Sequence, residues 1–235
     1  MLNMFNRAAP RLLADRIVSL GALCEVAFQV RRLSRAEQAY PFDWWITPLA
    51  GVAPVLEAGA AAVFAPQEIV KVSDYGGKAA LYSRLGGTVH LHEFPAGEDF
   101  LALSEEAISG RLVAKYAMLQ ERMVSTCRTG TTLFVRQRLR EHDPQGPALE
   151  AALDRLFGCL STLAADPRLL LLDYAPVAPR PWLVTAQIPA YRDHNDLGSR
   201  RGWNATFRAC GIACPPSGTR FRYDDLTATL EKGRR

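Results

Sequence analysis

Cys24 is the residue of this 235-residue chain whose type and position most directly suggest chemistry. It lies in the stretch "SLGALCEVAFQVRR" (19–32), three residues after Gly21 and near the start of an apolar helical pattern. Backbone N–H groups and the dipole at a helix N-terminus stabilise a thiolate, the form of cysteine that attacks a carbonyl carbon. Free cysteine is also among the most frequently buried residue types. The stretch therefore supports two interpretations, a nucleophile and a core thiol.

A cysteine nucleophile needs a base, and the stretch "TVHLHEF" offers two histidines. His90 and His92 differ by two positions, so both point to the same face if the stretch is a strand. A histidine base accepts the thiol proton while a third group orients its ring. We assign the base to His92 and expect His90 to line the substrate site. His142 and His194 fall in polar loop segments.

The stretch "YPFDWWITP" (40–48) places one carboxylate among aromatic rings. In the functional interpretation Asp43 orients the histidine, and Trp44 and Trp45 form the walls of a substrate pocket. In the structural interpretation the loop inserts its rings into the core, and Asp43 accepts hydrogen bonds from backbone N–H groups. Asp173, at the end of the run "LLLLD", competes for the orienting role.

Arg136 lies inside the apolar run "TTLFVRQ" (131–137), where a charged side chain must find an anionic partner. That partner is either a carboxylate of the protein, which we favour, or an anionic group of a substrate. Arg136 is therefore also a candidate substrate-binding residue.

The elements that position these residues alternate between strands and helices. Near-continuous apolar runs are typical of strands in a parallel sheet that is covered on both faces. A hairpin signal occurs at Gly86-Gly87, and Ser104 is a helix N-cap candidate followed by two glutamates. We expect strands at 16–21, 131–137, 168–174 and 181–188, a strand-rich region at 68–94, and helices at 22–33, 48–59, 104–126, 146–165 and 199–209. The pattern predicts an α/β fold in which residues 16–235 form a single domain, with a mixed, mostly parallel sheet flanked by helices, after a flexible arm at 1–15.

Composition excludes several classes of function. The net charge of +4 comes without a basic stripe interleaved with aromatic residues, which argues against nucleic acid as a partner. No apolar run reaches the roughly 18–20 residues that span a bilayer. The cysteines are five, an odd number and widely spread, which favours reduced thiols and a cytoplasmic location. Cys210 and Cys214 have the spacing of half a zinc site, but a second ligand pair is missing, so we expect neither a metal nor a cofactor.

The motifs in combination resemble a bacterial family of unknown function whose members are described as papain-like cysteine peptidases. The matching stretches are "SLG" followed by Cys24 and Ala27, "PFDW" at 41–44, "HEF" at 92–94 and "FVR" at 134–136. The resemblance extends over about residues 16–175. One difference is that Glu93 stands where aspartate is expected after the histidine.

The resemblance implies a hydrolase or acyl transferase of the Cys–His type, acting on a peptide, acyl or glycan-linked substrate. Family members often accompany genes for bacterial polysaccharides. A glycan-processing transferase, or a domain that binds a sugar or a nucleotide, is therefore an alternative, and Arg136 would then hold the anionic ligand. A third possibility is an interaction module that has the fold without the activity.

Overall fold

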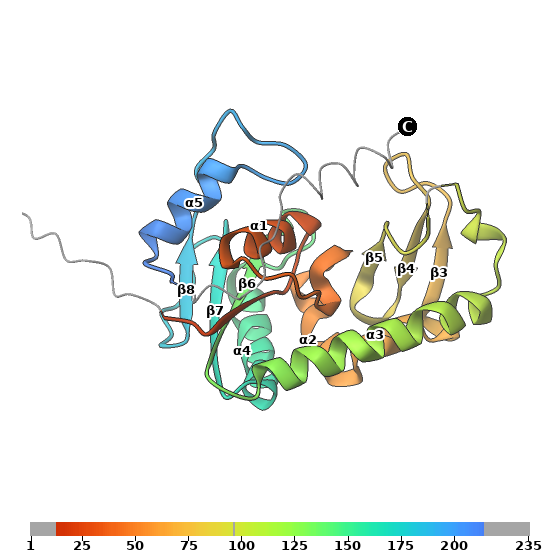
Figure 1. Ribbon diagram of the computed structural model, residues 1–235, viewed down its shortest axis with the longest axis horizontal. Helices are drawn as coiled ribbons and strands as arrows, with labels where there is room; N and C mark the ends of the chain where they lie inside the picture. Colours follow the sequence, from red (N-terminus) through yellow and green to blue (C-terminus); the bar gives the residue numbers. More distant parts are fainter. Residues whose placement is uncertain (1–12, 96, 214–235) are drawn as a thin grey trace, which may run out of the picture.

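The computed structural model describes residues 13–95 and 97–213, and its central element is a parallel four-stranded sheet. Strands β1 (Arg16–Ser19), β6 (Thr131–Gln137), β7 (Asp166–Leu172) and β8 (Leu183–Ala186) lie side by side in that order (Figure 1). The carboxyl ends of all four strands therefore meet at one edge of the sheet.

Helices cover both faces of the parallel sheet. One face packs against α1 (Cys24–Ser34) and α5 (Arg200–Ala209), and its core contains Val26, Leu133, Leu170, Trp203 and Phe207. The other face packs against α4 (Gly146–Leu163), which buries a leucine every three or four residues: Leu149, Leu153, Leu156 and Leu160. This two-sided burial explains why the strand sequences are continuously apolar.

A second sheet is antiparallel and lies beside the first (Figure 1). Its strands, in spatial order, are β2 (Trp45–Ile46), β5 (Thr88–His90), β4 (Ala80–Ser83) and β3 (Ile69–Val72). The chain between β1 and β6 supplies this sheet together with α2 (Leu49–Ala58) and the long helix α3 (Glu105–Cys127). One hydrophobic cluster contains Trp45 and Leu81 from this sheet and Phe134 and Leu171 from the parallel sheet, so the two sheets share a core.

The predicted α/β class is confirmed, and the structure adds that the strands divide into two sheets. The reason is that β2 to β5 are short and hydrogen-bond only with one another, whereas β6 extends over seven residues and pairs with β1 and β7. The expected strand at the "TVHLHEF" stretch ends at His90. The prediction that His90 and His92 share one strand face is therefore wrong: His90 is buried and His92 is exposed.

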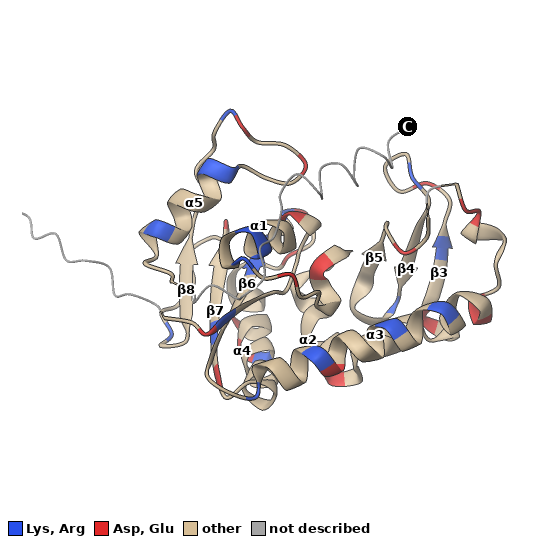
Figure 2. Ribbon diagram, viewed as in Figure 1, with Lys and Arg blue, Asp and Glu red and all other residues tan. Residues whose placement is uncertain are grey.

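Charged residues of both signs are interspersed along the chain, and α3 carries both (Figure 2). Among the helices that the structure describes, none combines the length and the apolarity needed to cross a bilayer. Most of the predicted N-terminal arm, and Cys214 of the considered zinc pair, lie outside the described residues.

Candidate functional site

Cys24 is the first residue of α1 and follows a short loop that leaves the carboxyl end of β1. Its side chain is partly exposed, in contrast to the fully buried Cys127. The loop requires Gly21, whose φ of +82° lies in the left-handed region that other residues rarely adopt. The fold thus presents a thiol at the sheet edge where α/β proteins usually bind ligands.

Burial raises the pKa of the Cys24 thiol, and this effect exceeds the opposing effect of the helix N-terminus. The backbone N–H groups of Cys24 and Glu25 lower the pKa, as expected at this position. The carboxylates of Glu25 and Asp196 raise it again through their negative charge. Cys24 is therefore a thiol at neutral pH, and chemistry at its sulfur needs a base to remove the proton.

A polar cluster lies around Glu25, the residue after Cys24, at the same sheet edge. Gln137, the last residue of β6, donates from Nε2 to Asp173 Oδ2 at 3.1 Å, and the backbone N–H of Ile188 donates to Asp173 Oδ1 at 2.8 Å. Asp173 has a φ of 65°, a conformation that typically costs about 1–3 kcal/mol in a residue other than glycine. These hydrogen bonds hold its carboxylate at the end of β7.

Glu25 joins this cluster from α1. It is 7% exposed, and its Oε1 accepts a hydrogen bond of 2.7 Å from Trp203 Nε1 of α5. Burial raises the pKa of Glu25, the Trp203 hydrogen bond and the nearby His194 lower it, and Asp173 raises it. Glu25 is therefore a buried carboxyl that holds its proton more tightly than a solvated glutamate does.

His194 lies in the loop that precedes α5, and this loop is fixed against α1. Gln29 of α1 donates from Nε2 to the carbonyl of Leu197 at 2.6 Å. Gly198 packs against the Glu25 carboxylate so closely that a Cβ atom there would overlap it. The same loop places Asp196 near Cys24 and His194 near Glu25, the residue that follows Cys24.

His92 lies beside Trp44, with ring centroids 6.3 Å apart in an edge-to-face arrangement. Trp44 also stacks under Arg31 of α1, whose guanidinium carbon is 5.5 Å from the ring centroid. Arg31 lies seven residues after Cys24, about 10 Å along the helix axis. Among the described residues, no hydrogen bond joins the Cys24 sulfur to a histidine.

His90 is 2% exposed, and its Nε2 is 2.8 Å from Thr88 Oγ1. Burial, with a smaller effect of Lys115, lowers the pKa of His90 to about 3. The ring packs between Trp45 and Phe64, at centroid distances of 4.7 and 4.8 Å. His90 is thus a neutral core histidine in this structure.

The aromatic stretch 40–48 inserts into the core. Asp43 forms a buried ion pair with Arg31 and accepts a hydrogen bond of 2.8 Å from the backbone N–H of Tyr40. Trp45 is fully buried and donates to Tyr116 at 2.9 Å, whereas Trp44 is partly exposed. Of the residues in this stretch, Trp44 is the one whose ring a ligand can reach.

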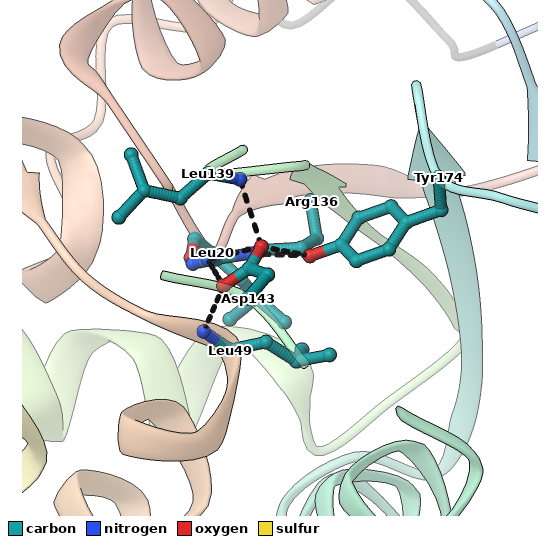
Figure 3. A network of polar contacts seen from close by, with 6 residues as sticks. All are labelled: Leu20, Leu49, Arg136, Leu139, Asp143 and Tyr174. Atoms are coloured by element: carbon teal, nitrogen blue, oxygen red, sulfur yellow. Dashed lines mark hydrogen bonds and ion pairs between the residues drawn. The ribbon is translucent and has the colours of Figure 1, made fainter. Parts of the chain in front are cut away.

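Arg136 is 0% exposed, and its guanidinium bonds only to protein acceptors among the described contacts (Figure 3). Asp143 is its carboxylate partner, with Nη2 to Oδ1 and Oδ2 distances of 3.1 and 3.2 Å. An external anion would therefore have to displace Asp143 from a buried pair, which is costly. Of the two anionic partners expected for Arg136, a protein carboxylate and a substrate anion, its contacts favour the protein carboxylate.

Sequence reasoning missed three residues of this region: Glu25, Gln137 and, as a neighbour of Glu25, His194. Gln137 carried one signal, since it follows Arg136 at the end of an apolar strand, where polar residues face the sheet edge. Among the described residues, no group of three His, Cys, Asp or Glu side chains is arranged to hold a metal ion.

The raised pKa of Glu25 gives a prediction about stability. A carboxyl whose pKa is raised on folding stabilises the protein below its unfolded pKa, roughly 4.3, and that contribution is lost as the pH rises through the folded pKa. Glu25→Gln removes the titration while its side-chain oxygen can still accept from Trp203. We expect the urea midpoint of Glu25→Gln to match the wild type near pH 4 and, in a series from pH 4 to 9, to exceed it by a growing margin until the pH passes the folded pKa.

The matched control is Glu121→Gln, which replaces an exposed carboxylate on α3. It measures how the removal of a surface carboxylate changes the urea midpoint across the same pH range. If the difference of Glu25→Gln from the wild type follows that of Glu121→Gln, folding does not raise the pKa of the Glu25 carboxyl.

The fold and the site together define the class: this is an α/β protein with a candidate thiol site. Its partly exposed cysteine begins the helix that follows β1, at the carboxyl edge of the parallel sheet. Residues 15–138 match the model of the family described as "Putative papain-like cysteine peptidase (DUF1796)". Because the match covers a little over half of the chain, the protein belongs to this family. Searches of curated proteins and of solved structures gave no match.

Proposed function

We propose that the protein is a cysteine-dependent acyl hydrolase or acyl transferase with Cys24 as its nucleophile. The observation that carries this proposal is the position of the thiol, which is partly exposed on the first residue of α1, where the backbone N–H groups of the first turn have no partner within the helix. Such N–H groups stabilise the oxyanion that forms when a thiol attacks a carbonyl. The family description supports a peptide or related acyl compound as the substrate.

We assign the general base to His194. Its loop approaches both Cys24 and Glu25, whereas His92 contacts Trp44 about two helical turns further along α1. In the first step His194 accepts the Cys24 proton, the sulfur bonds to the carbonyl carbon, and the leaving group departs with that proton. In the second step water, or an amine or hydroxyl acceptor, attacks the thioester and releases the thiol.

The carboxylates of Asp173 and Glu25 are assigned to the support of this site. Asp173 and Gln137 form a hydrogen-bonded pair at the sheet edge, and Glu25 anchors α1 to α5 through Trp203. We assign Trp44 to one wall of the substrate-binding region, because its ring is partly exposed and lies on the same side of α1 as Arg31.

The test is site-resolved acylation of the whole chain by p-nitrophenyl acetate. Peptide mass spectrometry measures acetylation at Cys24 and at Cys159, a partly exposed cysteine whose pKa is also raised by burial. We expect Cys24 to be acetylated at least about tenfold faster than Cys159 at pH 7, since in this proposal Cys24 has a histidine base and oxyanion donors, whereas the Cys159 thiol donates to the exposed Glu57 carboxylate. Equal rates would refute the nucleophile assignment and favour an inactive interaction module.

A further inference from the structure

The loop between β1 and Cys24 is fixed through its carbonyl groups. The Leu20 carbonyl accepts from Arg136 Nη1 at 3.0 Å. The Gly21 carbonyl accepts from the backbone N–H of Gln137, and the Ala22 carbonyl from that of Thr47, both at 3.1 Å. Two segments that are distant from the loop in sequence, the end of β6 and the residue that precedes Pro48, therefore determine where this loop places Cys24. Of the three donors, the Arg136 guanidinium is the one that belongs to a side chain.

The Arg136 guanidinium is itself held from two further directions (Figure 3). Nη2 pairs with Asp143, and Nε donates to Tyr174 Oη at 3.2 Å. Tyr174 in turn donates to Asp143 Oδ2 at 2.6 Å. A guanidinium is a planar fork with fixed donor directions, so holding two of its edges determines where the third points. That third direction is the Leu20 carbonyl.

The network connects the same strand ends that carry the candidate site. Arg136 and Gln137 are consecutive in β6 and therefore point to opposite faces of the sheet. Gln137 bonds to Asp173, and Arg136 bonds to the next residue, Tyr174. Asp143 extends the network by accepting from the backbone N–H groups of Leu49 at 2.6 Å and Leu139 at 2.8 Å. The ends of β1, β6 and β7 are thereby tied together on the face opposite the polar cluster.

We propose that Arg136 is a positioning residue for Cys24, which acts through the Leu20 carbonyl and is oriented by Asp143 and Tyr174. The inference rests on the proposed function, in which Cys24 is the nucleophile. Arg136 does not touch the reacting atoms. It holds the loop in the conformation that aligns the thiol with its base and with the N–H groups of α1, and a misalignment on the order of 1 Å can cost a factor of about 100 in rate.

Two variants test the proposal. Tyr174→Phe removes one hydroxyl that bonds to Arg136 and Asp143, and it keeps the ion pair between these two residues. Arg136→Lys keeps the positive charge and loses the planar guanidinium with its fixed donor directions. The matched control is Tyr116→Phe, which removes another buried hydroxyl, bonded to Glu93 and Trp45. Two quantities are measured: the Cys24 acetylation rate relative to Cys159 between pH 6 and 9, and the urea midpoint.

We expect Arg136→Lys to lower the rate of Cys24 acetylation at pH 7 by about tenfold or more, and Tyr174→Phe to lower it by about threefold, because the thiol loses its alignment with the base. In both variants the pH profile of the Cys24 acetylation rate should shift. Tyr116→Phe should lose comparable stability while its Cys24 rate stays at the wild-type value. If the Cys24 rate of Tyr174→Phe equals that of Tyr116→Phe, the proposal is overturned. If Arg136→Lys does not fold, the comparison of Tyr174→Phe with Tyr116→Phe by itself tests the positioning role of Arg136.

The proposed function and the positioning role can fail separately. If wild-type Cys24 is acetylated no faster than Cys159, the nucleophile assignment fails. Alkylation of Cys24 by iodoacetamide then reports the placement of the loop, because it depends on thiol exposure and pKa and needs no catalytic base. If the alkylation rate of Cys24 changes in Tyr174→Phe but not in Tyr116→Phe, the positioning role of Arg136 is supported. If the rate is unchanged in Tyr174→Phe, that role is overturned.

Discussion

Replacing His194 by alanine is expected to lower the rate of Cys24 acetylation at pH 7 by about 100-fold or more, which is the usual contribution of a general base. The effect should be this large because burial keeps Cys24 protonated, so that attack depends on proton removal at the moment of reaction. Stopped-flow detection of p-nitrophenolate, with mass spectrometry to locate the acetyl group, measures it. The variant should keep the wild-type urea midpoint, since His194 is exposed.

His92→Ala is the matched variant, because it removes a second exposed histidine that contacts Trp44. Its Cys24 rate should remain within about twofold of the wild type, the scale of a surface change away from the reacting atoms. Cys24→Ala supplies the background from the other cysteines. A large loss in His92→Ala with little change in His194→Ala would show that His92 is the base, as predicted from the stretch "TVHLHEF".

Asp143→Ala is expected to lower the free energy of unfolding by about 3–5 kcal/mol, because it leaves the Arg136 charge buried without its partner. The same carboxylate accepts hydrogen bonds from Tyr174 and from the backbone N–H groups of Leu49 and Leu139, so several donors lose their acceptor at once. A loss of this size is a large part of the stability of a typical domain. Urea denaturation followed by tryptophan fluorescence measures it.

The control is Glu57→Ala, which breaks the exposed ion pair between Arg155 and Glu57. Solvent screens that pair, so its loss should move the urea midpoint far less. If Asp143→Ala is as stable as Glu57→Ala, the buried network contributes little to folding, and its role as the support of the Cys24 loop would lose its basis.

Much of the fold could be predicted from local patterns. The strand at 131–137 and the helix near 199–209 follow from apolar runs and helical spacing, and both occur in the structure. Ser104 was predicted as an N-cap, and its Oγ accepts from the backbone N–H of Ala107 at 3.2 Å. These features depend on residues within a few positions of one another, which is the range that sequence patterns describe.

The site was harder to predict because long-range contacts determine it. The strand at His90 ends where Glu93 turns toward Tyr116 and Lys115 of α3, more than twenty residues later, and this separates His92 from the strand. The loop with His194 is held by Gln29, 168 positions away from its acceptor Leu197. The effect of the helix N-terminus on Cys24 was foreseen, but the larger effect of burial depends on neighbours that the sequence does not reveal.

The neighbouring strands β1 and β6 have a consequence for how the chain acquires its structure. Arg16 pairs with Thr132, so the two strands meet only after a closure of more than one hundred residues. Long closures slow folding, and the intervening segment, with its hairpin and its long helix, contains far more local contacts. During synthesis β1 and α1 must therefore wait for the segment that follows them, and the surroundings of Cys24 are completed only when the last third of the chain has emerged.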